Sequence, residues 1–389
     1  MITQSMNRRK WLKASAALAG AFTVAPGSVG FAASPLRALR MTAQSNYTEA
    51  AIARDFPKLK ARLFANENPF GPSEKAKQAI IDSASNSYMY PIFEGEQLAE
   101  RIATSQGFKK ENIAIASGST TILHAASVYF SKDGAEIISG DPSYDDLTKA
   151  SEKLEAKWIK VPLTKEHKLD LDEMEKLVTD KTSLVYICNP NNPTGTTLDT
   201  TKLKSFCERV SKKTTVFIDE AYIDYMGNPD DHTMMGLVKD GHNVIVARTF
   251  SKLYGFAGLR VGYIITQPEI VEQLSLFAWL ESGISYPAIA ALSACYGDKE
   301  FLQGALKKTQ ESKEYLYSVL KKEGYEYIPS STNFVMFPVN MDAERFVEEM
   351  MKRGVGVRPW KFDDKNWCRV SIGKMEEMKI FAEAFKQIS

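Results

Sequence analysis

The sequence predicts an α/β fold: a large domain with a mainly parallel seven-stranded sheet, followed by a smaller α+β domain. Seven short runs, apolar and often β-branched, follow one another along the chain without polar alternation. This pattern is typical of strands buried on both faces of a parallel sheet. Helical patterns separate the runs, which indicates right-handed crossovers. The runs are residues 113–116, 136–139, 158–161, 184–188, 216–218, 244–247 and 263–265.

Helices and further strands are expected on either side of this series. The turn-rich residues 66–72 lead to Ser73, a suitable N-cap for a helix over residues 74–83. Residues 267–277 are expected to begin a long connecting helix, and a charged helix follows Glu300. The strands of the smaller α+β domain are predicted at residues 334–337, 354–358 and 368–372.

Length and composition are those of a globular protein with more than one domain. The chain has 389 residues, of which 44% are apolar and 25% charged. Its 49 basic and 48 acidic residues give no bulk charge that favours nucleic acid or anionic lipid. We expect a signal segment at 1–32, an N-terminal arm and part of the small domain at 33–65, the large domain at 66–278 and the small C-terminal domain at 279–389.

The first 32 residues resemble a twin-arginine signal peptide. Arg8 and Arg9 are followed by a mildly apolar stretch rich in alanine and glycine, and small residues up to Ala32 suit a signal peptidase. Asn7 and Trp11 depart from the usual motif. An amphipathic helix with a surface arginine pair is disfavoured, because the segment contains no acidic residue. We therefore expect export of the folded protein by twin-arginine translocation, to the periplasm.

Several other kinds of site are not expected. The four histidines and four cysteines lack the spacing of metal ligands, and no G-x-G-x-x-G follows a strand. Ser318 and Ser371 each begin an S-x-x-K sequence, but no SDN or KTG partner accompanies them, so both are interpreted as chance. The cysteines are more typical of core residues than of a disulfide, although the sequence leaves one disulfide open.

Polar motifs follow four of the predicted strands at their carboxyl ends, where ligands of parallel sheets bind. Residues 117–120 (SGST) open a helix and present backbone N–H groups suited to a phosphate. NPNNPTG, DEAY and RTFSK occupy residues 189–195, 219–222 and 248–252. Each motif alone has an ordinary structural explanation as a cap or a turn. The ordered set of four predicts an active site.

These motifs resemble the histidinol-phosphate aminotransferases and their near relatives, which are fold-type I pyridoxal-phosphate enzymes of aminotransferase class I/II. The resemblance runs from Asn66 to Ser371. It is carried by NENPFGP, MYP, DPSY, NPNNPTG, DEAY, TFSKLYGFAGLRVG and CRVSIG. It implies a transferase, specifically a transaminase, that binds pyridoxal 5'-phosphate in its large domain.

The resemblance implies a role for each residue around the cofactor ring. Lys252 would bind the cofactor covalently and, once released, carry the substrate's α-proton. Asp219 would pair with the pyridine nitrogen and keep it protonated, so that the ring accepts electrons. Tyr222, the third catalytic residue, would hydrogen-bond the phenolic oxygen together with Asn192. Tyr144 would stack on the ring.

The resemblance also implies a phosphate site shared between two subunits. Arg260 would supply the bidentate charge that a phosphate favours, with Ser251 beside it. Tyr90, in MYP, matches a tyrosine that reaches the phosphate of the neighbouring subunit, which implies a homodimer. The other predicted phosphate ligands are Gly118, Ser119 and Thr120.

Substrate-binding residues are expected near the C-terminus. Arg369 matches the arginine that takes the substrate carboxylate, and Asn68 and Asn333 would line the same end of the site. Arg358 is a candidate for a distal acidic group, with a surface arginine as the alternative. Aromatic residues, among them Tyr47, favour an aromatic, imidazole or acidic substrate side chain.

Transamination between an amino acid, or an amino-phosphate-like donor, and a 2-oxo acid is the expected reaction. A lyase or decarboxylase on the same scaffold is the alternative, because the bond that breaks depends on which one stands perpendicular to the cofactor ring. Leu253 departs from the family, in which a small residue follows the lysine, and it indicates altered crowding there. Export argues against histidine biosynthesis, a cytoplasmic pathway.

Overall fold

A computed structural model describes residues 59–389. The predicted signal peptide, including Arg8 and Arg9, lies outside the described residues, and so does Tyr47. Among the residues that are described, no helix is long and apolar enough to cross a membrane.

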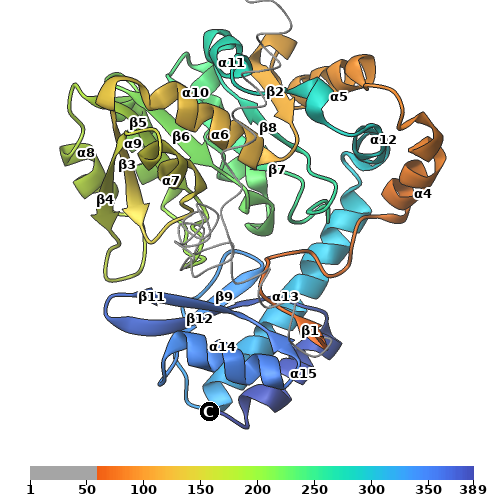
Figure 1. The fold of residues 1–389 in the computed structure, drawn as a ribbon, viewed down its shortest axis with the longest axis vertical. Helices are drawn as coiled ribbons and strands as arrows, with labels where there is room; N and C mark the ends of the chain where they lie inside the picture. Colours follow the sequence, from red (N-terminus) through yellow and green to blue (C-terminus); the bar gives the residue numbers. More distant parts are fainter. Residues whose placement is uncertain (1–58) are drawn as a thin grey trace, which may run out of the picture. The chain divides into compact units, whose positions relative to one another are not determined.

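A seven-stranded sheet lies at the centre of the larger part of the chain, in the order β2-β8-β7-β6-β5-β3-β4 (Figure 1). Strands β3 to β7 are parallel, whereas β8 runs antiparallel to both of its neighbours. The prediction of a mainly parallel seven-stranded sheet is confirmed. Its strands are β2 (Ile113–Ala116), β3 (Glu136–Asp141), β4 (Lys157–Pro162), β5 (Thr182–Cys188), β6 (Thr215–Asp219), β7 (Val244–Thr249) and β8 (Gly262–Ile265).

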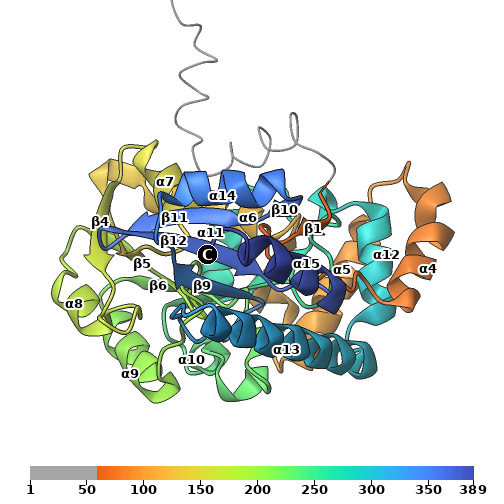
Figure 2. The ribbon, with the colours of Figure 1, turned by 90° about the horizontal axis from the view of Figure 1, so that it is seen from below.

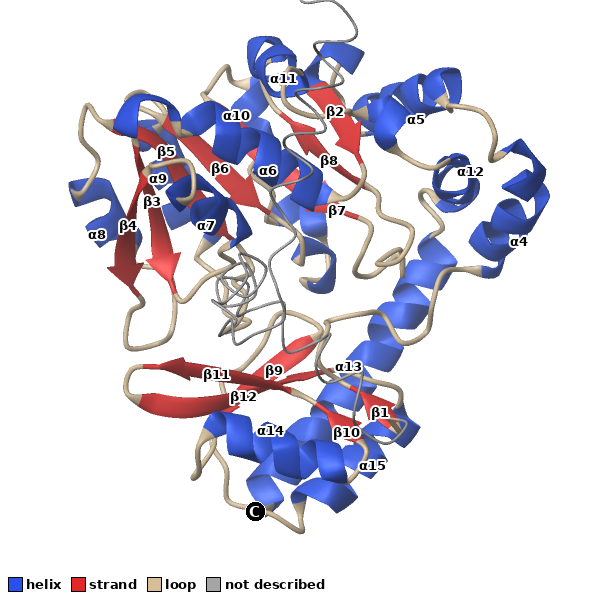
Figure 3. Cartoon of the chain, viewed as in Figure 1, coloured by secondary structure: helices blue, strands red, loops and turns tan. Residues whose placement is uncertain are grey.

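Side chains of this sheet enter two separate cores, as expected for strands covered on both faces. Phe217 in β6 shares a core with Ile122, whereas its neighbours Val216 and Ile218 share the other core with Phe206. Figure 3 shows helices on either side of the strands. One core includes α6 (Ser119–Phe130), α7 (Asp146–Glu152) and α11 (Pro268–Ser275). The other includes α5 (Ile92–Ser105), α8 (Leu171–Lys176), α9 (Thr200–Val210), α10 (Met235–Lys239) and α12 (Tyr286–Cys295).

A smaller antiparallel sheet, in the order β11-β12-β9, forms the second part. Seen from below, α13, α14 and α15 gather around it (Figure 2). A separate two-stranded sheet pairs β1 with β10. The elements are β1 (Ala61–Arg62), α13 (Lys299–Lys322), β9 (Phe334–Pro338), α14 (Ala343–Lys352), β10 (Val355–Gly356), β11 (Arg358–Phe362), β12 (Lys365–Ser371) and α15 (Met375–Phe385). The run predicted as one strand at 354–358 is divided, because the chain leaves β1 at Val357 and then pairs with β12.

Two helix predictions have opposite outcomes. The predicted helix 74–83 is confirmed as α4 (Glu74–Ser83), with Ser73 Oγ accepting from the backbone N–H of Ala76 at 3.2 Å. The long connecting helix expected from 267 is wrong, because α11 ends at Ser275 and the long helix is α13, with 24 residues. After α11 the chain forms the 3-10 helix η7 and then the separate helix α12, in which Pro287 stands in the first turn, where proline is tolerated. The 3-10 helices are η2 (Ala84–Asn86), η3 (Lys110–Asn112), η4 (Lys132–Gly134), η5 (Ile223–Tyr225), η6 (Pro229–Asp231) and η7 (Glu281–Gly283).

Candidate active site

The parallel sheet brings the predicted motifs to one edge. Cys188 at the end of β5 pairs in register with Asp219 at the end of β6, and Asp219 pairs with Ala247 in β7. NPNNPTG begins directly after β5, and the segment with Lys252 begins directly after β7. Three chain segments that are distant in sequence therefore leave the sheet side by side.

Asp219 is a buried carboxylate, with 2% of its surface exposed. It accepts hydrogen bonds from the Tyr186 hydroxyl at 3.0 Å and the Ala221 backbone N–H at 3.1 Å. Burial raises the pKa of the Asp219 carboxyl to about 6, although both hydrogen bonds and the charge of Lys252 oppose the rise. A cation bound against this carboxylate would remove the cost of burying its charge. A protonated ring nitrogen is such a cation.

Tyr186 was missed in the sequence, because it lies inside an apolar run and resembles a core residue. Its side chain is fully buried in β5, and burial raises the pKa of its phenol well above the ordinary value. Register pairs Tyr186 with Phe217, two residues before Asp219. Because strand side chains alternate, these residues share one face of the sheet. Alternation along the two strands is the signal that could have found it.

Asp219→Asn is expected to stabilise the cofactor-free protein above pH 6. The carboxyl pKa is 3.8 ordinarily and about 6 in the folded chain, so the folded state holds the proton more tightly. Stability therefore falls as the pH rises from about 4 to about 6, at a cost on the order of 2–3 kcal/mol. An amide avoids that cost. Melting temperatures of both apoproteins test this: the variant should gain a few degrees at pH 8 and little at pH 4. Equal melting temperatures at pH 8 would contradict the prediction.

Lys252 lies beside Tyr222, with Nζ 5.3 Å from the centre of the phenol ring. The Tyr222 ring meets Phe334 edge to face at 5.1 Å between centres. Leu253, the bulky residue that departs from the family pattern, is buried in the same apolar cluster as Tyr222 and Phe334. The Leu253 carbonyl accepts from Asn68 Nδ2 at 2.7 Å, so Asn68 holds the backbone next to the lysine.

Arg260 and the start of α6 form a cradle for an anion. Its guanidinium donates to Ser251 Oγ at 3.2 Å and to Thr120 Oγ1 at 3.5 Å. Gly118 has a φ of 78°, and a Cβ there would lie 2.2 Å from Arg260 Nη2, so only glycine allows this approach. Ser119 begins α6, and the N-cap residue Gly118 has no side chain that could accept from the N–H groups of the first turn. Guanidinium and first-turn N–H groups together suit a phosphate.

Arg369 is buried at the other end of the site, with 2% exposed. Its guanidinium donates to Asn192 Oδ1 at 2.6 Å and to the Phe64 carbonyl at 2.9 Å, and lies 5.2 Å from the Phe334 ring centre. The Asn192 amide nitrogen is then the donor for the predicted bond to the cofactor. Arg358 stands directly opposite Arg369 in the β11–β12 pair, so the two arginines lie on the same face of the small sheet.

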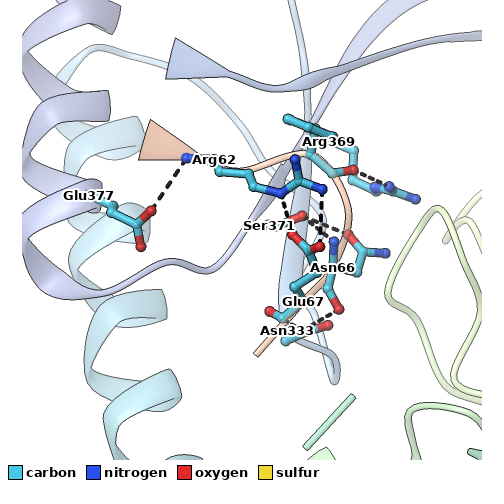
Figure 4. Close-up of polar contacts among 8 residues, drawn as sticks. Arg62, Asn66, Glu67, Asn333, Arg369, Ser371 and Glu377 are labelled. Atoms are coloured by element: carbon cyan, nitrogen blue, oxygen red, sulfur yellow. Dashed lines mark hydrogen bonds and ion pairs between the residues drawn. The ribbon is translucent and has the colours of Figure 1, made fainter. Parts of the chain in front are cut away.

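Asn66 is a second residue that sequence reasoning missed. Its side chain joins Tyr222 to Ser371. Figure 4 shows Asn66 between Ser371 and Asn333, whose Nδ2 donates to the Asn66 backbone carbonyl at 3.0 Å. Asn333 therefore supports the segment through its backbone. The motif NENP contains two asparagines, Asn66 and Asn68, and the family resemblance implies a role for Asn68 alone. Asn66 differs from Asn68 in its backbone, which has a left-handed φ of 53°. The sequence does not reveal this conformation.

The two remaining tyrosines differ in environment. The Tyr144 hydroxyl donates to the carboxylate of Asp146. Burial, followed by the charge of Asp146, raises the pKa of the Tyr144 phenol, and the charge of Asp219 adds to the rise. Tyr144 is half-buried and packs against the core that includes Phe217. Tyr90 lies on the surface before α5, with 73% exposed.

The cysteines belong to the interior. All four lie within the described residues as unpaired, buried thiols, and burial raises the pKa of each. Thiols of this kind are protonated at neutral pH and unreactive. In residues 59–389, no group of three or more His, Cys, Asp or Glu side chains could hold a metal ion.

The side chains present fit pyridoxal phosphate. Asp219 is a buried acid suited to a protonated ring nitrogen, and Lys252 supplies the amine that reacts with an aldehyde. The cradle at Arg260 matches the phosphate in charge and in donors. Tyr222 offers a hydroxyl next to the lysine.

Known proteins share both the sequence and the fold. The family model for class I and II aminotransferases matches residues 60–385. The histidinol-phosphate aminotransferase of Moorella thermoacetica is 34% identical over 329 residues, which cover 84% of this chain and 85% of the relative.

Two solved structures extend the comparison. The histidinol-phosphate aminotransferase of Sinorhizobium meliloti, in complex with pyridoxal-5'-phosphate, superposes with a TM-score of 0.81 at 27% identity, over 87% of this chain and 95% of that one. The L-threonine-O-3-phosphate decarboxylase of Porphyromonas gingivalis shares the fold, with a TM-score of 0.73 at 18% identity over 84% and 99% of the two chains.

Proposed function

This chain belongs to the class I and II aminotransferase family, and we propose that its amino donor carries an anionic group, a carboxylate or a phosphate, that Arg369 binds. It is a pyridoxal-phosphate-dependent aminotransferase of the histidinol-phosphate aminotransferase type. The proposed donors are amino acids and amino phosphates such as histidinol phosphate, and the acceptor is a 2-oxo acid.

When bound, the cofactor supplies an electron sink that makes the α-hydrogen of the donor acidic. Asp219 is suited to hold a proton at the ring nitrogen, because its buried carboxylate would gain a cationic partner there. Lys252 Nζ, next to the Tyr222 ring, is the group that would take the proton from the donor's α-carbon and hold it within the site. Tyr222 and Asn192 would orient the ring from its phenolic oxygen.

The observation that carries the proposed substrate class is the buried guanidinium of Arg369. Asn192 Oδ1 and the Phe64 carbonyl accept hydrogen bonds from this guanidinium and fix its position. A guanidinium held in place in this way can bind a carboxylate or a phosphate through two parallel hydrogen bonds. Arg358, on the same sheet face, would favour a donor with a second anionic group.

A donor screen on the purified protein tests this proposal. Histidinol phosphate, acidic, aromatic and small aliphatic amino acids would each be incubated with 2-oxoglutarate or pyruvate. Transfer to the 2-oxo acid is expected from anionic donors, fastest from those with a second anionic group or an aromatic ring. Amines without an anionic group should be poor donors. Release of CO₂ or ammonia without transfer would identify the decarboxylase or lyase alternative instead.

We also propose a homodimer, supported by an exposed apolar surface. Tyr88, Tyr90 and Phe93, before and at the start of α5, are 83%, 73% and 75% exposed, and Trp279 is 73% exposed. The segment after Trp279 packs on α5, where a Cβ at Gly95 would lie 3.1 Å from Glu281 Cβ. Exposed apolar residues that cluster in this way mark protein interfaces.

Phe93→Glu is expected to give a monomer that binds the cofactor poorly, because the charge would be buried at the interface and Tyr90 of a second copy could not reach the phosphate. Tyr90→Phe is the matched control: it should stay dimeric, with about tenfold weaker cofactor binding from one lost hydrogen bond. Sedimentation and cofactor titration measure both properties. An active monomer in the wild type would contradict the proposal.

Twin-arginine export to the periplasm is proposed from the sequence, and its segment lies outside the described residues. Changing Arg8 and Arg9 to lysine should retain a folded, cofactor-loaded precursor in the cytoplasm. Mature protein that still leaves the cytoplasm would show that the pair is not the signal.

A further inference from the structure

We infer that Asn66 is a positioning residue, which directs the Tyr222 hydroxyl toward the cofactor and ties it to the strand that carries Arg369. Asn66 is 2% exposed and has a φ of 53°, a left-handed conformation that asparagine tolerates better than most residues. Both ends of its side-chain amide are engaged. The part of this inference that concerns Arg369 rests on the proposed function.

Ser371 determines which end of the Asn66 amide faces Tyr222. Ser371 Oγ accepts from the Asn66 backbone N–H at 2.8 Å, so its own hydrogen donates to Asn66 Oδ1, also at 2.8 Å. The Nδ2 end therefore points to the Tyr222 hydroxyl oxygen, at 3.0 Å, and donates to it. The Tyr222 oxygen is the acceptor on this side, so its hydrogen is directed elsewhere. The phenolic oxygen of the cofactor is the acceptor that this hydrogen would reach.

The same amide links the hydroxyl to the substrate end of the site. Ser371 and Arg369 are two residues apart on β12, so their side chains lie on one face of the strand. Asn333 holds the Asn66 carbonyl from the start of β9 (Figure 4). A shift of β12 on binding of the donor's anion to Arg369 would therefore reach Tyr222 through one buried side chain.

The test is a pH titration of the visible absorbance of the bound cofactor, without substrate. A hydrogen bond donated to the phenolic oxygen stabilises its negative charge, so its loss lets that charge hold the neighbouring proton more tightly. Asn66→Asp replaces the donor with an acceptor of the same shape and turns the Tyr222 hydroxyl toward the new carboxylate. The titration midpoint should rise by about 1 pH unit in Asn66→Asp and in Tyr222→Phe.

The double variant separates positioning from a general structural effect. If Asn66 acts through Tyr222, Asn66→Asp adds nothing in the Tyr222→Phe background. An additive shift in the double variant, or an unchanged midpoint in Asn66→Asp, would overturn the inference. Glu67→Gln, a change in the next residue, is the matched control and should leave the midpoint unchanged. If Asn66→Asp fails to fold, Asn66→Gly keeps the left-handed backbone and removes the donor; it should shift the midpoint upward, and no shift would overturn the inference.

The titration is independent of the proposed substrate class. An unchanged midpoint in a variant that still prefers anionic donors would overturn the role of Asn66 alone. A raised midpoint in an enzyme with no preference for anionic donors would support the role of Asn66 and overturn only the proposed donor class.

Discussion

Lys252→Ala is expected to lower the rate of amino transfer by at least about 10⁴-fold, the upper range for loss of a positioned acid–base group. Lys252 is the amine beside Tyr222, and the variant keeps the Lys252 backbone carbonyl that accepts from the Gly255 N–H. The phosphate cradle at Arg260 and the carboxylate of Asp219 remain in the variant. It should therefore still bind pyridoxal phosphate, without the covalent bond.

Borohydride reduction followed by mass spectrometry of the intact chain measures that bond directly. The wild type should gain the mass of the reduced cofactor at Lys252, and the variant should not. A small primary amine added to the variant should restore part of the proton transfer, because it can occupy the space that the lysine side chain leaves empty. Turnover near the wild-type rate in Lys252→Ala would exclude this lysine as the acid–base group.

Arg369→Gln should have the second largest effect, on kcat/KM for anionic donors. The arginine is buried and offers charge-assisted hydrogen bonds, each contributing roughly 1.5–3 kcal/mol, so a loss of about 10² to 10³-fold is expected. Glutamine keeps a polar side chain that can still contact Asn192, which limits disturbance of the NPNNPTG loop. Steady-state kinetics with each donor measure the effect.

Arg358→Gln is the matched comparison from the opposite strand position. It should affect only donors with a second anionic group, and leave donors with a single carboxylate near the wild-type value. The absorbance of the bound cofactor should be the same in both variants, since Asp219 and Arg260 are untouched. Equal losses for charged and uncharged donors in Arg369→Gln would indicate damage to the fold rather than loss of an anion site.

The sequence predicted the large sheet well, because buried parallel strands appear as apolar runs and polar motifs mark where they end. It could not predict where a helix ends or where a strand changes its partner. Residues 267–277 have a helical pattern, but α11 ends at Ser275, the separate helix α12 begins at Tyr286, and α13 is the long helix instead. Near Val357 the pattern is one continuous run, and only the change of strand partner divides it.

Within the site, motifs at strand ends were predictable, whereas residues that support them through tertiary contacts were not. Tyr186 lies within an apolar run of the sequence. It supports the site through the hydrogen bond that its hydroxyl donates to Asp219. Asn66 contacts Tyr222 and Ser371, which are 156 and 305 residues away in sequence. The direction of a hydrogen bond between such distant residues depends on the folded chain. Composition and periodicity do not reveal the direction of such a hydrogen bond.

The most direct measurement for an aminotransferase is the half-reaction of the purified protein with a donor alone. Histidinol phosphate, or an acidic or aromatic amino acid, added without a 2-oxo acid should convert the bound cofactor from its aldehyde to its amine form, one equivalent per site. The visible absorbance should then disappear, and a 2-oxo acid should restore it. Release of CO₂ or ammonia from the donor while the cofactor stays in its aldehyde form would contradict amino transfer.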